Sequence, residues 1–214
     1  MLCRSLSAVS LCFLLLSGAQ AALDEDLVRP LQDRWAEIKY RLPEKQQAEQ
    51  YGQLAEQAQQ IRQANPNVAA VLVWEGIIVS SQAGARGGLG GLSLAKKARR
   101  LLEESLMLDE KAMNGSAYTS LGTLYAKVPR RPIGFGDRAR AEELFRKSLQ
   151  INPDGIDPNY FYGEYLVDMG RVAEGRGYLE KALEAPARPG RELADEGRRL
   201  EIQALLKKTA SENR

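Results

Sequence analysis

Apolar residues recur every three or four positions along most of the chain, the spacing that places them on one face of a helix. Leu27, Leu31 and Trp35 begin this pattern, and Pro43 is the first residue to interrupt it. Nothing in the chain convincingly indicates a strand. We expect helices at residues 25–41, 44–64 and 191–208, and two in each of the stretches 67–110, 114–153 and 156–187. The sequence therefore predicts an all-α protein with nine helices.

Those three stretches repeat one order of large and small residues. Each has a glycine on its first helix and a large apolar residue on its second. The pairs are Gly76 with Leu102, Gly122 with Phe145, and Gly163 with Leu179. A glycine inside a helix costs about 1 kcal/mol relative to alanine. Its return at one position of the repeat therefore predicts that the two helices approach closely there.

Residues 67–187 resemble tetratricopeptide repeats, which are pairs of antiparallel helices about 34 residues long. The last stretch carries the pattern most plainly, in Asn159, Tyr162, Gly163, Leu166, Gly175, Leu179 and Ala182. The resemblance implies a right-handed solenoid of about four helix pairs, with residues 22–66 as a degenerate first pair. Residues 188–214 would then be a capping helix and tail. We expect the following apolar side chains of that helix to face the stack: Leu193, Leu200, Ile202, Leu205 and Leu206.

Two insertions lengthen the repeats between the helices of a pair, at 84–91 and 128–137. The first is glycine-rich and precedes a helix, so we expect a loop that is flexible, touches a partner or binds an anion. It lacks the Gly-Lys-Ser/Thr ending of a phosphate-binding loop. The second contains prolines and glycines, and Asp137 at its end should cap the next helix. Candidate contact residues are Arg86, Arg130, Arg131 and Phe135, although Phe135 is equally a candidate for packing.

The insertions also resemble those of the periplasmic T component of some TRAP transporters. In that family a turn containing proline and glycine comes before a helix like residues 139–145. The resemblance implies an accessory protein that binds a solute for a transporter. Members of that family are typically lipoproteins with a lipobox cysteine, which this chain lacks, since neither Cys3 nor Cys12 follows a lipobox.

The first helices of the pairs should line the inner surface of the stack. By register, this surface consists of Val73, Ile77, Ser80, Ser116, Thr119, Thr123, Asp157, Tyr160 and Glu164. Our candidates for contact with a partner or ligand are Thr119, Thr123, Tyr160 and Glu164. Tetratricopeptide domains that hold a terminal carboxylate use Lys, Arg and Asn at such positions, and this set has none of them. We therefore expect a groove for an extended or helical partner segment.

Residues 1–21 have the organisation of a cleaved secretory signal. Its parts are Arg4, an apolar run over residues 11–16, and the small-x-small sequence Ala19-Gln20-Ala21. The apolar run is shorter than the roughly 20 residues needed to span a bilayer. We therefore expect a periplasmic protein that begins near Ala22 and is not stably inserted in a membrane.

Composition narrows the chemistry further. Both cysteines lie in the leader and the chain has no histidine. This excludes Cys and His zinc sites, as well as Cys–His and Ser–His nucleophiles, from the mature protein. A formal net charge of +2 gives no support to nucleic-acid binding, which requires a strong basic excess. We expect neither a metal nor a cofactor.

Two functions remain. The first is a non-enzymatic scaffold or adaptor of the bacterial periplasm, which binds a protein partner through its groove and its loop-bearing edge. The alternative is a solute-binding accessory component of a transporter. Asp and Glu alone can catalyse glycoside hydrolysis, but no pair of carboxylates stands out from the ordinary charges of a helix surface. We therefore do not expect an enzyme.

Overall fold

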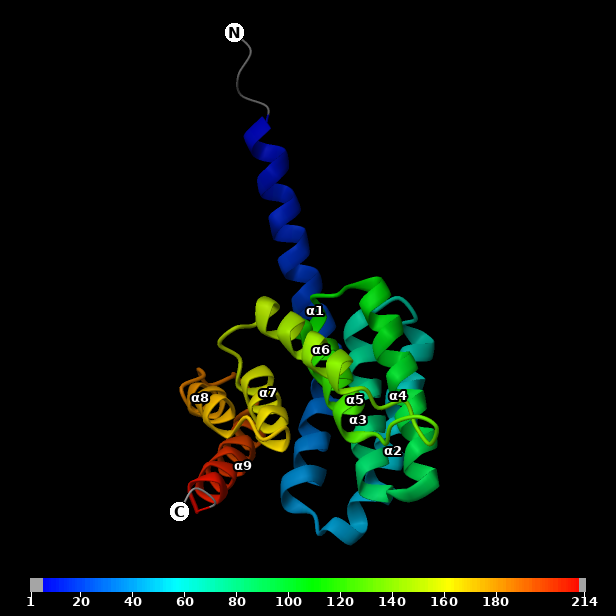
Figure 1. The fold of residues 1–214 in the computed structure, drawn as a ribbon. Coiled ribbons are helices and arrows are strands. Elements are labelled where there is room, and N and C mark those ends of the chain that lie inside the picture. The colour runs from blue at the N-terminus through cyan, green and yellow to red at the C-terminus, as the bar shows by residue number, and fades with distance from the viewer. Residues whose placement is uncertain (1–5, 212–214) are drawn as a thin grey trace.

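The computed structural model describes residues 6–211, with side chains for residues 24–210. This part of the chain contains nine helices and no strand, so the all-α prediction is confirmed. Figure 1 shows how the helices are arranged. The helices are α1 (Leu6–Arg41), α2 (Glu44–Ala64), α3 (Ala69–Arg86), α4 (Gly88–Leu108), α5 (Ala112–Lys127), α6 (Arg138–Ile151), α7 (Ile156–Asp168), α8 (Val172–Leu183) and α9 (Glu192–Ser211).

Helix α1 is longer than the helix predicted for residues 25–41, because it begins at Leu6 and continues through Pro30. The predicted signal at 1–21 falls partly on residues 1–5, which lie outside the described residues. The rest of it is described only as helical backbone. The export signal therefore stays a prediction.

The helices pack in sequence-adjacent pairs, α3 with α4, α5 with α6, and α7 with α8. The odd-numbered helices also contact one another in order, from α1 to α3, α5, α7 and α9. Helix α9 then contacts α1 again, although the two helices lie at opposite ends of the described chain. The odd-numbered helices therefore form a closed ring.

The three repeated glycines lie where the paired helices meet. A Cβ atom on Gly76 would lie 2.7 Å from Leu102 Cγ, and one on Gly122 would lie 2.8 Å from Phe145 Cε1. Gly163 has the same relation to Leu179, whose Cγ would be 2.9 Å away. Real Cβ atoms essentially never come this close to another heavy atom. The predicted close approach is confirmed in all three pairs.

The glycine-rich segment 84–91 is not an inserted loop, which corrects the prediction. Helix α3 runs to Arg86 and α4 begins at Gly88, so the added residues lengthen both helices. Gly87 and Gly88 make the turn with φ of +63° and +57°, a conformation that favours glycine. A Cβ on Gly91 would lie 2.6 Å from the Ala83 carbonyl oxygen. The glycines therefore permit close helix packing.

Segment 128–137 is a loop, as predicted, and it is folded tightly on itself. The Gly136 amide donates to the Pro129 carbonyl oxygen at 2.9 Å, and the Asp137 amide donates to the Tyr125 carbonyl oxygen of α5 at 2.9 Å. The Asp137 side chain accepts a hydrogen bond from the Arg140 amide at 3.1 Å, which confirms its role as the cap of α6.

Helix α9 packs on the stack through four of the five apolar side chains predicted to face it, and Leu193 is one of them, partly buried against the core of α1–α5. Ile202 is fully buried against α7 and α8, with Leu205 and Leu206 partly buried beside it. Leu200, however, is 60 % exposed and points away from the stack. Arg198 of the same helix is buried. The helix turns Arg198 inward because its side chain meets two carboxylates and two aromatic rings there.

Candidate functional site

The odd-numbered helices surround a cavity of about 1250 Å³ that is open to solvent. Of the nine residues predicted for the inner surface, eight line it: Ile77, Ser80, Ser116, Thr119, Thr123, Asp157, Tyr160 and Glu164. The ninth, Val73, lies in the hydrophobic core of α1–α5. The cavity exceeds the roughly 300–1000 Å³ of typical small-molecule pockets, so it has room for an organic solute together with water.

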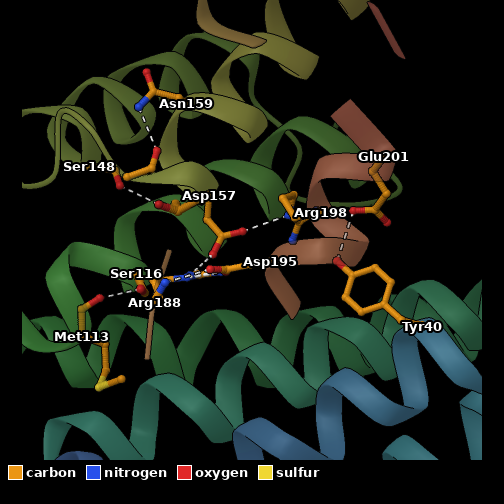
Figure 2. Close-up of polar contacts among 12 residues, drawn as sticks. Tyr40, Met113, Ser116, Ser148, Asp157, Asn159, Arg188, Asp195, Arg198 and Glu201 are labelled. Atoms are coloured by element: carbon orange, nitrogen blue, oxygen red, sulfur yellow. Dashed lines mark hydrogen bonds and ion pairs between the residues drawn. The ribbon is translucent and has the colours of Figure 1, made fainter. Parts of the chain in front are cut away.

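A network of charges joins α7, α9 and α1 along one side of the cavity (Figure 2). Asp157 of α7 lies between two arginines, with Arg188 Nη1 at 2.7 Å and Arg198 Nε at 2.9 Å. Arg198 also pairs through Nη1 with Glu201 Oε2 at 2.6 Å, and the Tyr40 hydroxyl of α1 donates to the same oxygen at 3.3 Å. These contacts close the ring.

Burial and charge oppose one another in this network. Burial raises the pKa of Asp157, but the charges of Arg188 and Arg198 overcome this effect and hold the pKa below its usual range. For Arg198, burial lowers the pKa, but the groups around it, with the charge of Asp157 first and that of Glu201 among the others, together raise the pKa above its usual range. Burial raises the pKa of Tyr40, which therefore stays a hydrogen-bond donor at neutral pH. All three groups are thus fixed in one protonation state.

Another part of the cavity wall is aromatic. Trp35 of α1 and Trp74 of α3 meet edge to face, with ring centroids 6.1 Å apart, and Trp35 Nε1 donates to Ser81 Oγ at 2.9 Å. Gln32 lies one helical turn before Trp35 and is only 1 % exposed. Neither polar atom of its amide, nor Trp74 Nε1, has a hydrogen-bond partner among the described residues. Buried polar groups in proteins are nearly always paired, so these atoms need an explanation.

Arg191 extends over the Trp74 ring, with its guanidinium carbon 5.0 Å from the ring centroid. It is half-buried, immediately precedes α9 and lines the cavity. Burial and the like charge of Arg188 lower its pKa, although the guanidinium stays charged at any ordinary pH. The site thus contains a partly desolvated cation beside an aromatic wall.

A left-handed turn forms another edge of the cavity, at the start of α5. Met113 and Asn114 have φ of 50° and 55°, and Gly115 follows with φ of 74°. Met113 and Asn114 line the cavity. A methionine in this region is uncommon and strained by about 1–2 kcal/mol, so the packing around Gly115 must hold the turn in place.

The structure divides the predicted site residues into two groups. Thr119, Thr123, Tyr160 and Glu164 lie together on the cavity wall. Thr119 is buried and shares a 2.5 Å hydrogen bond with Ser148, and Glu164 pairs with Lys127 at 3.3 Å. Burial raises the pKa of Tyr160, whose ring lies 4.4 Å from the Arg198 guanidinium carbon. Thr123 and Glu164 are only partly buried and remain open to a ligand, while Thr119 and Tyr160 are buried and mainly pack.

The second group lies outside the cavity. Arg86, Arg130 and Arg131 are exposed and line no part of it. Phe135 is half-buried, with its ring 5.3 Å from Tyr125 and 4.6 Å from the Arg99 guanidinium carbon. Of the two roles considered for Phe135, the contacts indicate packing.

Sequence reasoning missed the residues that close and charge the cavity. Arg188, Arg191, Arg198 and Glu201 belong to a segment interpreted only as a cap. The one available signal was an unusual density of arginines just before and within α9. That density did not indicate where the side chains would point.

Within the described residues, no group of three or more His, Cys, Asp or Glu side chains could hold a metal ion. None of the helices in that part of the chain is long and apolar enough to cross a membrane. No known protein family matches the chain, and no curated protein matches it either.

Proposed function

We propose that this protein is a non-catalytic binding protein of the periplasm that holds a small organic solute inside its ring of helices. The helix pairs would form a right-handed solenoid of tetratricopeptide type. The recurring glycine contacts at one position of three successive pairs support this interpretation. The predicted leader at 1–21 supports export.

One observation carries the binding function. The cavity is large, and its wall combines the rings of Trp35, Trp74 and Tyr160 with a few hydroxyl and charged side chains. Sites for small organic ligands have this composition, an apolar and aromatic lining with a small number of polar groups that fix the orientation of the ligand. The geometry favours a solute over a segment of a partner protein, because contacts between α1 and α9 close the ring against a long chain passing through it.

The test is a thermal-shift screen of the full chain, exported and purified, against acids, amides, amines and sugars. At least one solute should raise the melting temperature. The variant Ser80→Trp places an indole in the cavity and should lose that response, whereas Arg86→Gln, on the outer surface, should keep it. If no solute in the screen stabilises the wild-type protein, the proposed function is wrong.

The second candidate is the protein scaffold, and the loop at 128–137 favours it. Ile133 is 65 % exposed on this loop, next to the exposed Arg131. A photocrosslinker at Ile133 should give one discrete protein adduct in living cells if this loop binds a partner. A crosslinker at Arg100, exposed on α4, provides the control. Only diffuse background at Ile133 would exclude the loop as a docking site.

A further inference from the structure

Arg191 differs from the other arginines on the cavity wall. Arg188 and Arg198 each lie within 2.9 Å of a carboxylate oxygen of Asp157. Arg191 has no carboxylate within ion-pair distance among the described residues, and its guanidinium instead lies over Trp74. The cavity therefore contains a partly buried positive charge without a direct ion pair among the described residues. Asp157, Asp195 and Asp33 act on it only from beyond ion-pair distance.

A partly buried charge without a counter-ion is unfavourable, since it has lost water and gained no ion pair. The Trp74 ring returns some of this energy through a cation–π contact, which is worth about 0.5–2 kcal/mol. It also covers one face of the guanidinium while the N–H groups at its edge remain able to donate. Those N–H groups form the planar fork that binds a carboxylate through two parallel hydrogen bonds.

The surroundings suit the rest of such a ligand. Trp35 packs against Trp74 and provides an apolar wall next to the charge. Resting on the proposed function, we infer that Arg191 and Trp74 form a carboxylate-binding subsite, and that the solute is an organic monocarboxylate with an apolar body.

The charges of the cavity favour a monocarboxylate over a phosphate. Lys39 and Lys127 are already paired, with Glu201 at 3.1 Å and Glu164 at 3.3 Å. Asp157 and these two glutamates line the same cavity and would repel a dianion. One guanidinium fork matches one carboxylate in charge and in shape.

The experiment compares acids with their neutral amides by isothermal titration calorimetry. The probes are phenylacetate with phenylacetamide, and hexanoate with hexanamide. In the wild-type protein each acid should bind at least tenfold more tightly than its amide. Arg191→Gln should weaken the acids roughly 10- to 100-fold and leave the amides unchanged, since it removes a charge-assisted hydrogen-bonding group. The affinity of Arg191→Lys for the acids should fall between those of the wild-type protein and Arg191→Gln. Arg86→Gln should bind acids and amides as the wild-type protein does.

The outcomes separate the subsite from the function. If acids and amides bind the wild-type protein equally, or if Arg191→Gln leaves the preference intact, the carboxylate subsite is wrong and the solute-binding function stands. If neither acid binds but another solute in the thermal-shift screen does, the subsite is again wrong. Binding of inorganic phosphate in place of the acids would also overturn it. If no solute binds at all, the proposed function fails as well. The wild-type comparison of acid with amide does not depend on the folding of any variant.

Discussion

Replacing Arg198 with methionine tests whether the charge network holds α9 in the ring. The Arg198 side chain is 7 % exposed and pairs with Asp157 and Glu201. It also stacks between two rings, with its guanidinium carbon 4.4 Å from Tyr160 and 4.5 Å from Phe161. Methionine keeps much of the volume and the apolar contact with both rings, so the substitution removes mainly the charge.

The expected magnitude follows from what the substitution leaves behind. Removing one partner of a buried ion pair costs about 3–5 kcal/mol, because the other partner stays buried and unpaired. Here Asp157 keeps Arg188 at 2.7 Å, and Glu201 keeps Lys39 at 3.1 Å. The loss should therefore lie near the lower limit, at about 3 kcal/mol. A chain of this size loses roughly 2–4 °C per kcal/mol, so the melting temperature should fall by about 6–12 °C.

Urea unfolding at pH 7, followed by circular dichroism, measures this loss as a lower midpoint. The exposed Arg100→Met on α4 serves as the control and should stay within about 0.5 kcal/mol of wild type. Combining Arg198→Met with Asp157→Asn should give less than the sum of the two losses, since both remove one interaction. If Arg198→Met is as stable as the Arg100 control, the network adds nothing to stability and the reasoning fails.

Four further outcomes test other parts of the structure. Because the pKa of Asp157 is lower in the folded protein than its unfolded value near 3.9, its contribution is present above about pH 4 and fades as the pH falls further. In urea midpoints measured from pH 5 to pH 2, Asp157→Asn should therefore flatten the decline. Gly122→Ala should cost about 1–3 kcal/mol in urea unfolding, because the new methyl group meets the Phe145 ring. Gly177→Ala, with open space around it in α8, should instead gain up to about 1 kcal/mol. Phe135→Ala should lower the melting temperature through a loss of about 1–2 kcal/mol and leave solute binding unchanged in calorimetry, because its ring contacts are structural; weaker binding would refute that assignment.

Features that depend on a single helix or on one helix pair could be predicted from the sequence. The expected helix at 44–64 has the bounds of α2, because Pro43 and Asn65-Pro66 limit it on both sides. The close contact between Gly122 and Phe145 follows from the repeated order of small and large residues, since both residues belong to one helix pair. The cavity wall is predictable for the same reason, as helical register decides which side faces inward.

Features that depend on contacts between distant segments could not be predicted. The segment at 84–91 has the composition of a loop, and only the close approach of Gly91 to Ala83 explains why it stays helical. Arg198 is buried, and Leu200 is exposed where we expected it to face the stack, because Asp157, 41 residues away, pairs with the arginine. No periodicity within α9 contains that information.

The closed ring makes α9 responsible for both the stability and the chemistry of the cavity. Arg198 is neutralised by Asp157 and Glu201, so its charge joins helices and attracts no ligand. Arg191 immediately precedes the same helix and has no carboxylate within ion-pair distance among the described residues. Asp195 lies one turn further along the chain and pairs with Arg188 instead. If Arg191 only clamped Trp74, an uncharged side chain of similar length would do so without the penalty of burying a charge. Residues that lower stability are expected at binding sites. Arg191, a partly buried charge without an ion pair in the described part of the chain, fits this expectation, whereas the paired Arg198 stabilises the fold.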